Sequence, residues 1–188
     1  AFDLARTRRK KVTAVHKANV LKMTDGLFLD VVRAMAAADY PDIELEELIV
    51  DAMTAHLIRR PETFDVAVTT NAFGDILSDE AAELSGGLGL GGAINAGDDH
   101  AFAQASHGAA PDIAGQGVAN PTALMLSVTM LLDWLGRRHG RDDIVKAAKV
   151  YEDAVEAALQ DADARTPDVG GNGGTERFGA RVAELIAG

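Results

Sequence analysis

Strand-like and helix-like segments alternate along residues 1–85, and this alternation limits how the chain can fold more than any other feature. Apolar runs predict strands at residues 11–15, 43–50 and 64–70. Helical spacing of apolar residues and proline stops predict helices at residues 2–9, 27–38, 51–60 and 74–84. The last helix is expected to follow a turn at Gly74. This order is typical of an α/β fold, in which helices sandwich a parallel or mixed sheet.

The composition changes after residue 85, where residues 86–92 are dense in glycine. We interpret this run as a hinge or domain crossing, followed by a loop-rich stretch to Asn120. Three helices are then expected. The first has Asn120 as its N-cap before Pro121 and runs to about Leu135, the second spans residues 143–161, and the third runs from near Thr175 to the end. A turn-rich connector at residues 167–171 separates the last two. The sequence therefore predicts two segments, residues 1–85 and 86–188.

Composition excludes several classes of function. The 188 residues are 47% apolar, which is enough to build a core, and they contain no cysteine, which excludes disulfides and thiolate chemistry. A formal net charge of −11 argues against a nucleic-acid partner, and we interpret the short basic run at residues 6–11 as a solvated helix end. No signal peptide and no run that could span a membrane are found, so we expect a cytoplasmic protein.

Four charged residues follow predicted strands in residues 1–85. Lys17 follows the first strand, Asp51 the second, and Asp75 and Asp79 lie four residues apart in the helix after the third. Carboxyl ends of parallel strands meet at one sheet edge, where α/β sheets bind ligands. The two helical carboxylates share a face, as suits magnesium or manganese. Taken singly, Lys17 could be a solvated lysine, Asp51 and Asp75 helix N-caps, and Asp79 an acid that complements the helix dipole.

A rigid loop of small residues runs from Ser106 to Gly115 and contains one proline and one acid. Its backbone could approach a ligand closely, and its acid could accept hydrogen bonds from a ribose diol while repelling a phosphate on that ribose. An ordinary surface loop remains an alternative. The glycine run at 86–92 is not a dinucleotide fingerprint, because it follows a helix and has the wrong spacing.

Taken together, these segments resemble the β-decarboxylating dehydrogenases, which include the isocitrate, homoisocitrate, 3-isopropylmalate and tartrate/malate dehydrogenases. The motifs that carry the resemblance are Lys17-Ala18-Asn19-Val20, Asn71 to Asp79, Gly86-Gly87-Leu88-Gly89, His107 to Gly115, and Ala119-Asn120-Pro121-Thr122. The resemblance implies part of that family's two-domain fold. Residues 1–85 would belong to the segment for substrate, metal and dimer contacts, and residues 86–188 to the cofactor-binding segment.

The resemblance implies roles for five residues of the first segment. Lys17 matches the family's catalytic lysine, with Asp51 beside it, and Asn19 matches a residue near the nicotinamide. Asp51, Asp75 and Asp79 match aspartates that hold Mg²⁺ or Mn²⁺. In the family Asp51 and Lys17 come from one subunit and the other two aspartates from its partner, so a homodimer with a shared active site is expected.

The second segment would hold the adenosine end of the cofactor. The matching positions are His107, Gly108, Ala110, Asp112, Ile113 and Asn120. Relatives that use NADP carry a lysine–tyrosine pair where Asp112 and Ile113 stand. The resemblance therefore implies NAD as the cofactor.

The substrate is expected to be a small hydroxy-dicarboxylate or hydroxy-tricarboxylate. Residues 22–29 and 165–171 look more like the isocitrate and homoisocitrate members than the 3-isopropylmalate members, which remain an alternative together with tartrate or D-malate dehydrogenases. An alternative of another class is a non-catalytic regulatory subunit, although such chains typically lose the lysine or metal aspartates. Family members are considerably longer, so we expect this chain to be their C-terminal portion and to be inactive alone.

Overall fold

The computed structural model describes residues 1–188, and the chain divides into two compact units, Ala1–Ala81 and Ala82–Gly188. Helix α4 (Asn71–Leu84) crosses this division, which thus lies inside a helix and not at the glycine run. No helix combines the length and the apolar character needed to cross a bilayer. Each unit has a core of its own.

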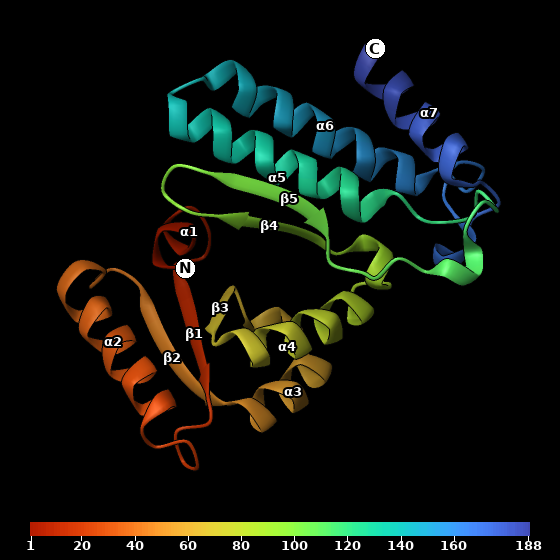
Figure 1. Ribbon diagram of the computed structural model, residues 1–188. Coiled ribbons are helices and arrows are strands. Elements are labelled where there is room, and N and C mark those ends of the chain that lie inside the picture. Colours follow the sequence, from red (N-terminus) through yellow and green to blue (C-terminus); the bar gives the residue numbers. More distant parts are fainter. The chain divides into compact units, whose positions relative to one another are not determined.

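The first unit is built on a three-stranded parallel sheet. Strand β1 (Lys11–His16) lies between β2 (Glu44–Ile49) and β3 (Val66–Thr69), as Figure 1 shows. The helices of this unit are α1 (Phe2–Arg6) before β1, α2 (Thr24–Asp39) and α3 (Val50–Arg59) between the strands, and the first part of α4 after β3, with a 3-10 turn η1 (Pro61–Thr63) before β3. The predicted α/β fold is confirmed, and each predicted strand and helix of this unit is present with slightly different bounds.

Strand β1 is buried on both faces of the sheet, which explains its continuous apolar run. Val12 and Ala14 belong to one core cluster, which α1 and α2 complete. Val15, which points to the opposite face, packs with Met53 of α3 and Leu77 of α4. Helices therefore cover both faces, and the ends of the strands are left to carry polar residues.

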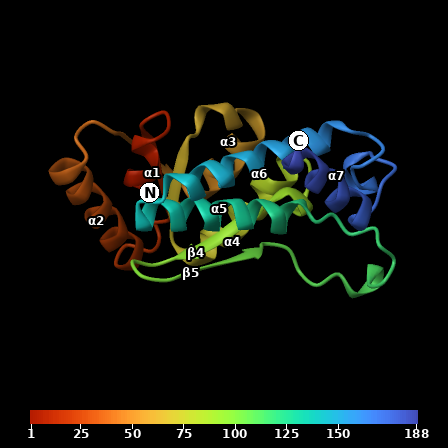
Figure 2. The ribbon, with the colours of Figure 1, turned by 90° about the horizontal axis from the view of Figure 1, so that it is seen from above.

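The second unit combines a hairpin with three helices. Strands β4 (Gly92–Ala96) and β5 (Ala101–Ala105) pair antiparallel, and α5 (Thr122–His139) packs on both. Helix α6 (Asp142–Gln160) runs beside α5, and α7 (Thr175–Ala187) packs on α6 (Figures 1 and 2). Short 3-10 turns complete it: η2 (Leu88–Leu90), η3 (Pro111–Ile113) and η4 (Pro167–Val169). Phe178 and Val155, both fully buried, anchor the contact between α6 and α7.

Three expectations about local structure were wrong. The stretch predicted as loop contains β4 and β5. Gly74 is not a turn, because α4 begins three residues earlier at Asn71. Helix α5 begins at Thr122 with Pro121 as its N-cap and extends to His139, although the Asn120 Oδ1 atom does accept a hydrogen bond from the Thr122 amide (3.0 Å).

The basic run at residues 6–11 pairs with acids of the same unit. Arg8 Nε lies 2.9 Å from an oxygen of Asp65, and Lys10 Nζ lies 3.3 Å from one of Asp42. Both cations stay about half exposed, so the run is a solvated surface, as interpreted. Its ion pairs tie it to the segments that precede β2 and β3.

Candidate functional site

The carboxyl ends of the three parallel strands bring two of the predicted site residues together. The register pairs His16 of β1 with Ile49 of β2, the last residue of each strand. Lys17 follows β1 directly, and Asp51 follows β2 in the first turn of α3. Two residues that are 34 positions apart in sequence are thus aligned by strand pairing, and their side chains meet at the sheet edge.

Lys17 and Asp51 form an ion pair in which Lys17 Nζ donates a hydrogen bond to Asp51 Oδ1. The side chain of Lys17 is 28% exposed and that of Asp51 is 69% exposed, so the pair faces solvent at its acidic end. This hydrogen bond is the main cause that holds the pKa of Asp51 below its ordinary value. The pair therefore presents an amine and an ionised carboxylate side by side on an accessible surface.

The structure does not support the N-cap alternatives for the aspartates. Ile49 is the N-cap of α3, and it makes no side-chain capping bond, so Asp51 does not cap the helix. Asp75 lies one turn inside α4, which begins at Asn71, and Asp79 follows one turn later. Both helical aspartates are exposed. Their exposure leaves the carboxylates free to meet a ligand.

A single chain does not assemble the predicted metal site. No group of three or more His, Cys, Asp or Glu side chains is arranged to hold a metal ion. Exposed carboxylate oxygens suit a hard divalent cation by their chemistry. Within one copy, however, Asp51, Asp75 and Asp79 do not converge, and the expectation that two copies contribute to one site remains a prediction.

The second unit contains a cavity of about 820 Å³, a size in the range of small-molecule sites. Five of the six predicted adenosine-site residues line it: His107, Gly108, Ala110, Ile113 and Asn120. Asp112 does not line the cavity. It lies beside Ile113 in η3 with an exposed side chain, while its backbone oxygen accepts a bond from Gln116 (2.8 Å).

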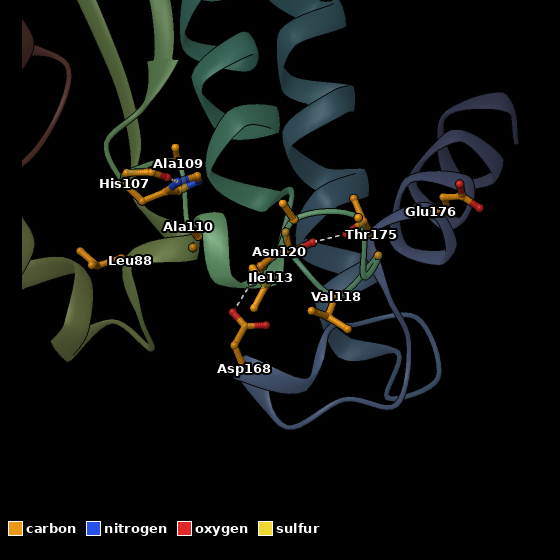
Figure 3. Close-up of a pocket in the computed structure, with 16 residues that line it drawn as sticks. Leu88, His107, Ala109, Ala110, Ile113, Val118, Asn120, Asp168, Thr175 and Glu176 are labelled. Carbon is orange, nitrogen blue, oxygen red and sulfur yellow. Dashed lines mark hydrogen bonds between the residues drawn. The ribbon is translucent and has the colours of Figure 1, made fainter.

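One wall of the cavity is fixed by contacts between segments far apart in sequence. Asn120 Nδ2 donates to Asp168 Oδ2 of η4 (2.9 Å), and Figure 3 shows Asp168 turned toward Asn120. Thr175, the first residue of α7, donates to the backbone oxygen of Ala119. A Cβ atom on Gly89 would lie 3.0 Å from the Asn120 Cβ and 3.2 Å from Asp168 Oδ2. Glycine at this position therefore leaves room for the Asn120–Asp168 bond.

Sequence reasoning missed several residues of this wall. Asp168, Thr175 and Glu176 line the cavity. From the sequence, Asp168 is part of a connector that resembles the isocitrate members and Thr175 is a helix start, and none of the three is predicted to line a ligand site. One signal could have pointed to Asp168: it is an acid in a glycine-containing turn segment, where a backbone can approach a ligand closely. Asn19, by contrast, lies exposed in the loop between β1 and α2.

A family model described as isocitrate/isopropylmalate dehydrogenase matches residues 1–182 of the chain. The chain belongs to this family. Its membership confirms the resemblance drawn from the motifs of Lys17, Asp75 and His107.

Relatives of the isocitrate/isopropylmalate dehydrogenase family match nearly all of this chain. The isocitrate/homoisocitrate dehydrogenase of Thermus thermophilus is 50% identical over 178 residues, which is 95% of this chain and 51% of that protein. The 3-isopropylmalate dehydrogenase of Archaeoglobus fulgidus is 50% identical over 187 residues, 99% of this chain and 55% of that protein. The crystal structure of isocitrate dehydrogenase from Methylococcus capsulatus superposes with a TM-score of 0.90 at 46% identity, covering 100% of this chain and 54% of that one. The chain spans about half the length of the curated relatives it matches.

Proposed function

We propose that the full-length protein carrying this chain oxidises and decarboxylates a 2-hydroxy-3-carboxy acid with NAD and a divalent metal. The observation that carries the proposal is the Lys17–Asp51 pair at the carboxyl ends of β1 and β2, in a chain of the isocitrate/isopropylmalate dehydrogenase family. Isocitrate and homoisocitrate are the substrates we favour. 3-Isopropylmalate is the second candidate, because a relative of that name is equally similar to this chain. We place the enzyme in the cytoplasm.

The chemistry follows from an amine held beside a carboxylate. The amine of Lys17 would accept the proton of the substrate hydroxyl as general base. NAD, when bound, would supply the hydride acceptor for the oxidation. Asp51, kept ionised by its low pKa, stabilises the ammonium that results. Mg²⁺ or Mn²⁺, held by Asp51, Asp75 and Asp79 from two subunits, would polarise the hydroxyl and stabilise charge on oxygen during decarboxylation. Asn19 would lie near the nicotinamide.

The cavity of the second unit is proposed to hold the adenosine end of NAD. Gly89 and Gly108 are among its lining residues and leave room for a flat base, and the Asn120–Asp168 bond would fix the orientation of the Asn120 amide. The Asp112 carboxylate, exposed beside the cavity, could accept bonds from the ribose diol and would repel a 2′-phosphate.

Gly89→Ala is expected to raise the Kd for NAD by about fivefold, because the added methyl would displace Asn120 or Asp168 and break a bond worth about 1 kcal/mol. Isothermal titration of the full-length protein with NAD measures it. Gly97→Ala in the turn between β4 and β5 is the matched control, since its Cβ would meet nothing closer than 3.7 Å. Equal affinities for the Gly89 variant and the wild type would contradict this account of the wall.

The homodimer is proposed to form through α3 and α4, the helices that carry the three aspartates. Each helix exposes a large apolar side chain: Ile58 is 65% exposed and Ile76, next to Asp75, is 62% exposed. Apolar side chains beside candidate ligands fit a surface that a second copy covers, and a twofold interface would let each copy supply aspartates to the other's site.

Ile76→Glu is expected to raise the dimer dissociation constant by at least about 100-fold, because an unpaired charge buried in an interface costs roughly 3 kcal/mol or more. Sedimentation velocity of the full-length protein across a concentration series measures the change. Val150→Glu on α6, where the side chain is 50% exposed, is the control for an added charge. A dimer that survives the Ile76 substitution unchanged would place the interface elsewhere.

The function is tested by following NADH formation by the full-length protein with isocitrate, homoisocitrate, 3-isopropylmalate, D-malate and tartrate in turn. We expect turnover with Mg²⁺ or Mn²⁺, loss with a chelator, and recovery when the metal is restored. Turnover with only one of the acids assigns the substrate. No turnover with any of them, in a protein that binds NAD and metal, would favour the regulatory subunit instead.

A further inference from the structure

Asp25 is a buried carboxylate that the mechanism above does not use. It lies in the first turn of α2, is 3% exposed and makes no ion pair. Burying a charged group without a cation is unfavourable unless strong hydrogen bonds compensate for the lost water. The backbone amide of Lys17 donates a 2.6 Å hydrogen bond to Asp25 Oδ2, and Thr24 Oγ1 donates a longer one (3.4 Å) to Oδ1. The positive end of α2 adds to this compensation.

The backbone around Lys17 is held at three consecutive polar groups. Asp25 accepts the Lys17 amide, and His16 Nδ1 accepts the Ala18 amide (3.0 Å). The Lys17 carbonyl accepts the amides of Val20 and Leu21 at 2.9 and 2.8 Å. His16 is itself nearly buried at the end of β1, so its ring is fixed by the sheet. A backbone fixed on both sides limits the directions that the Lys17 side chain can take.

We propose that Asp25 is a positioning residue: by holding the Lys17 amide, with His16 holding the next one, it directs the Lys17 amine toward Asp51. The catalytic meaning of this position rests on the proposed function, whereas the geometry does not. A displacement of about 1 Å at a reacting group can lower a rate by about 100-fold, so a fixed backbone here has a large effect on turnover.

The geometry is tested by reductive methylation of lysines in the full-length protein with isotope-labelled formaldehyde, followed by mass spectrometry. Asp25→Ala is expected to raise the labelling rate of Lys17 by about two- to fivefold, the range of a surface ion pair that is lost. Asp25→Asn, whose amide oxygen can still accept the Lys17 amide, should label like the wild type. Lys149, which is paired with Glu152 and Asp153 on α6, serves as the internal reference.

The outcomes separate positioning from general loosening. Faster labelling at Lys17 alone supports the proposal, and an unchanged Lys17 rate in Asp25→Ala overturns it. Equal rises at Lys17 and Lys149 also overturn it, because they report a loosened fold. If Asp25→Ala does not fold, His16→Phe, which removes the acceptor for the Ala18 amide, replaces it and should also speed labelling at Lys17; an unchanged rate there overturns the proposal.

A second arm measures turnover. Asp25→Ala should lower kcat by about 10- to 100-fold with the KM for NAD unchanged, and Asp25→Asn should restore most of it. Asp30→Ala removes an exposed acid from the same helix and should leave kcat as it is. A wild-type protein without turnover would refute the proposed function, while the labelling result would still decide whether Asp25 positions Lys17.

Discussion

Lys17→Met in the full-length protein is expected to lower kcat by about 10²- to 10⁴-fold, the usual contribution of a positioned general base. Methionine keeps the length of the side chain but cannot accept a proton. Because the amine acts on a proton that moves in the transition state, kcat and kcat/KM should fall together while the KM for NAD stays constant. Steady-state formation of NADH at saturating substrate and metal measures the effect.

The matched control for Lys17 lies at the other end of the same strand. Lys11 begins β1, and although burial alone would lower the pKa of its ammonium, the ion pairs with Glu46 and Glu44 raise that pKa above its ordinary value. Lys11→Met should leave kcat within about twofold, since it removes only a structural ion pair. A Lys17 variant that keeps more than a tenth of wild-type kcat would remove this residue from the chemistry.

Cofactor preference is expected to change when Asp112→Lys and Ile113→Tyr are combined. The exposed Asp112 carboxylate would no longer repel a 2′-phosphate, and a lysine there would attract it. The ratio of kcat/KM for NAD to that for NADP should fall by about 100-fold, which corresponds to about 2.8 kcal/mol of differential binding. Initial rates with each cofactor in the full-length enzyme measure the ratio.

A separate variant controls for the change of charge in Asp112→Lys. Asp163→Lys reverses the same charge at an exposed position of the second unit, outside the cavity. It should leave the ratio unchanged, because its added charge lies outside the cavity. A general attraction of positive charge for NADP would instead lower the ratio in both variants. If the double variant at 112 and 113 kept the wild-type ratio, Asp112 would not be a determinant of cofactor choice.

The parallel block could be predicted because local and tertiary signals agree there. Val12, Val15 and Val66 are β-branched, buried and flanked by helices of regular period, so the strand pattern is the one that the sheet needs. The meeting of Lys17 with Asp51 also followed, since it depends only on the ends of neighbouring parallel strands.

The hairpin and the cavity wall could not be predicted in the same way. Strands β4 and β5 consist largely of alanine and glycine, which are weak strand formers, and they are stabilised by packing on α5 rather than by their own propensity. The bond between Asn120 and Asp168 joins residues 48 positions apart that no local pattern connects. The three metal aspartates do not converge within one copy, and a site completed by a second copy stays a prediction.

The two outer strands of the parallel sheet differ in how well they resist association with foreign chains. Strand β2 carries three glutamates, Glu44, Glu46 and Glu47, and like charges on an edge discourage another strand from pairing with it. Strand β3, Val66–Thr69, has no charged residue. When this chain is produced by itself, β3 is therefore the edge from which aggregation would begin. The substitution Ala67→Lys would place a charge on that edge and discourage pairing with another chain.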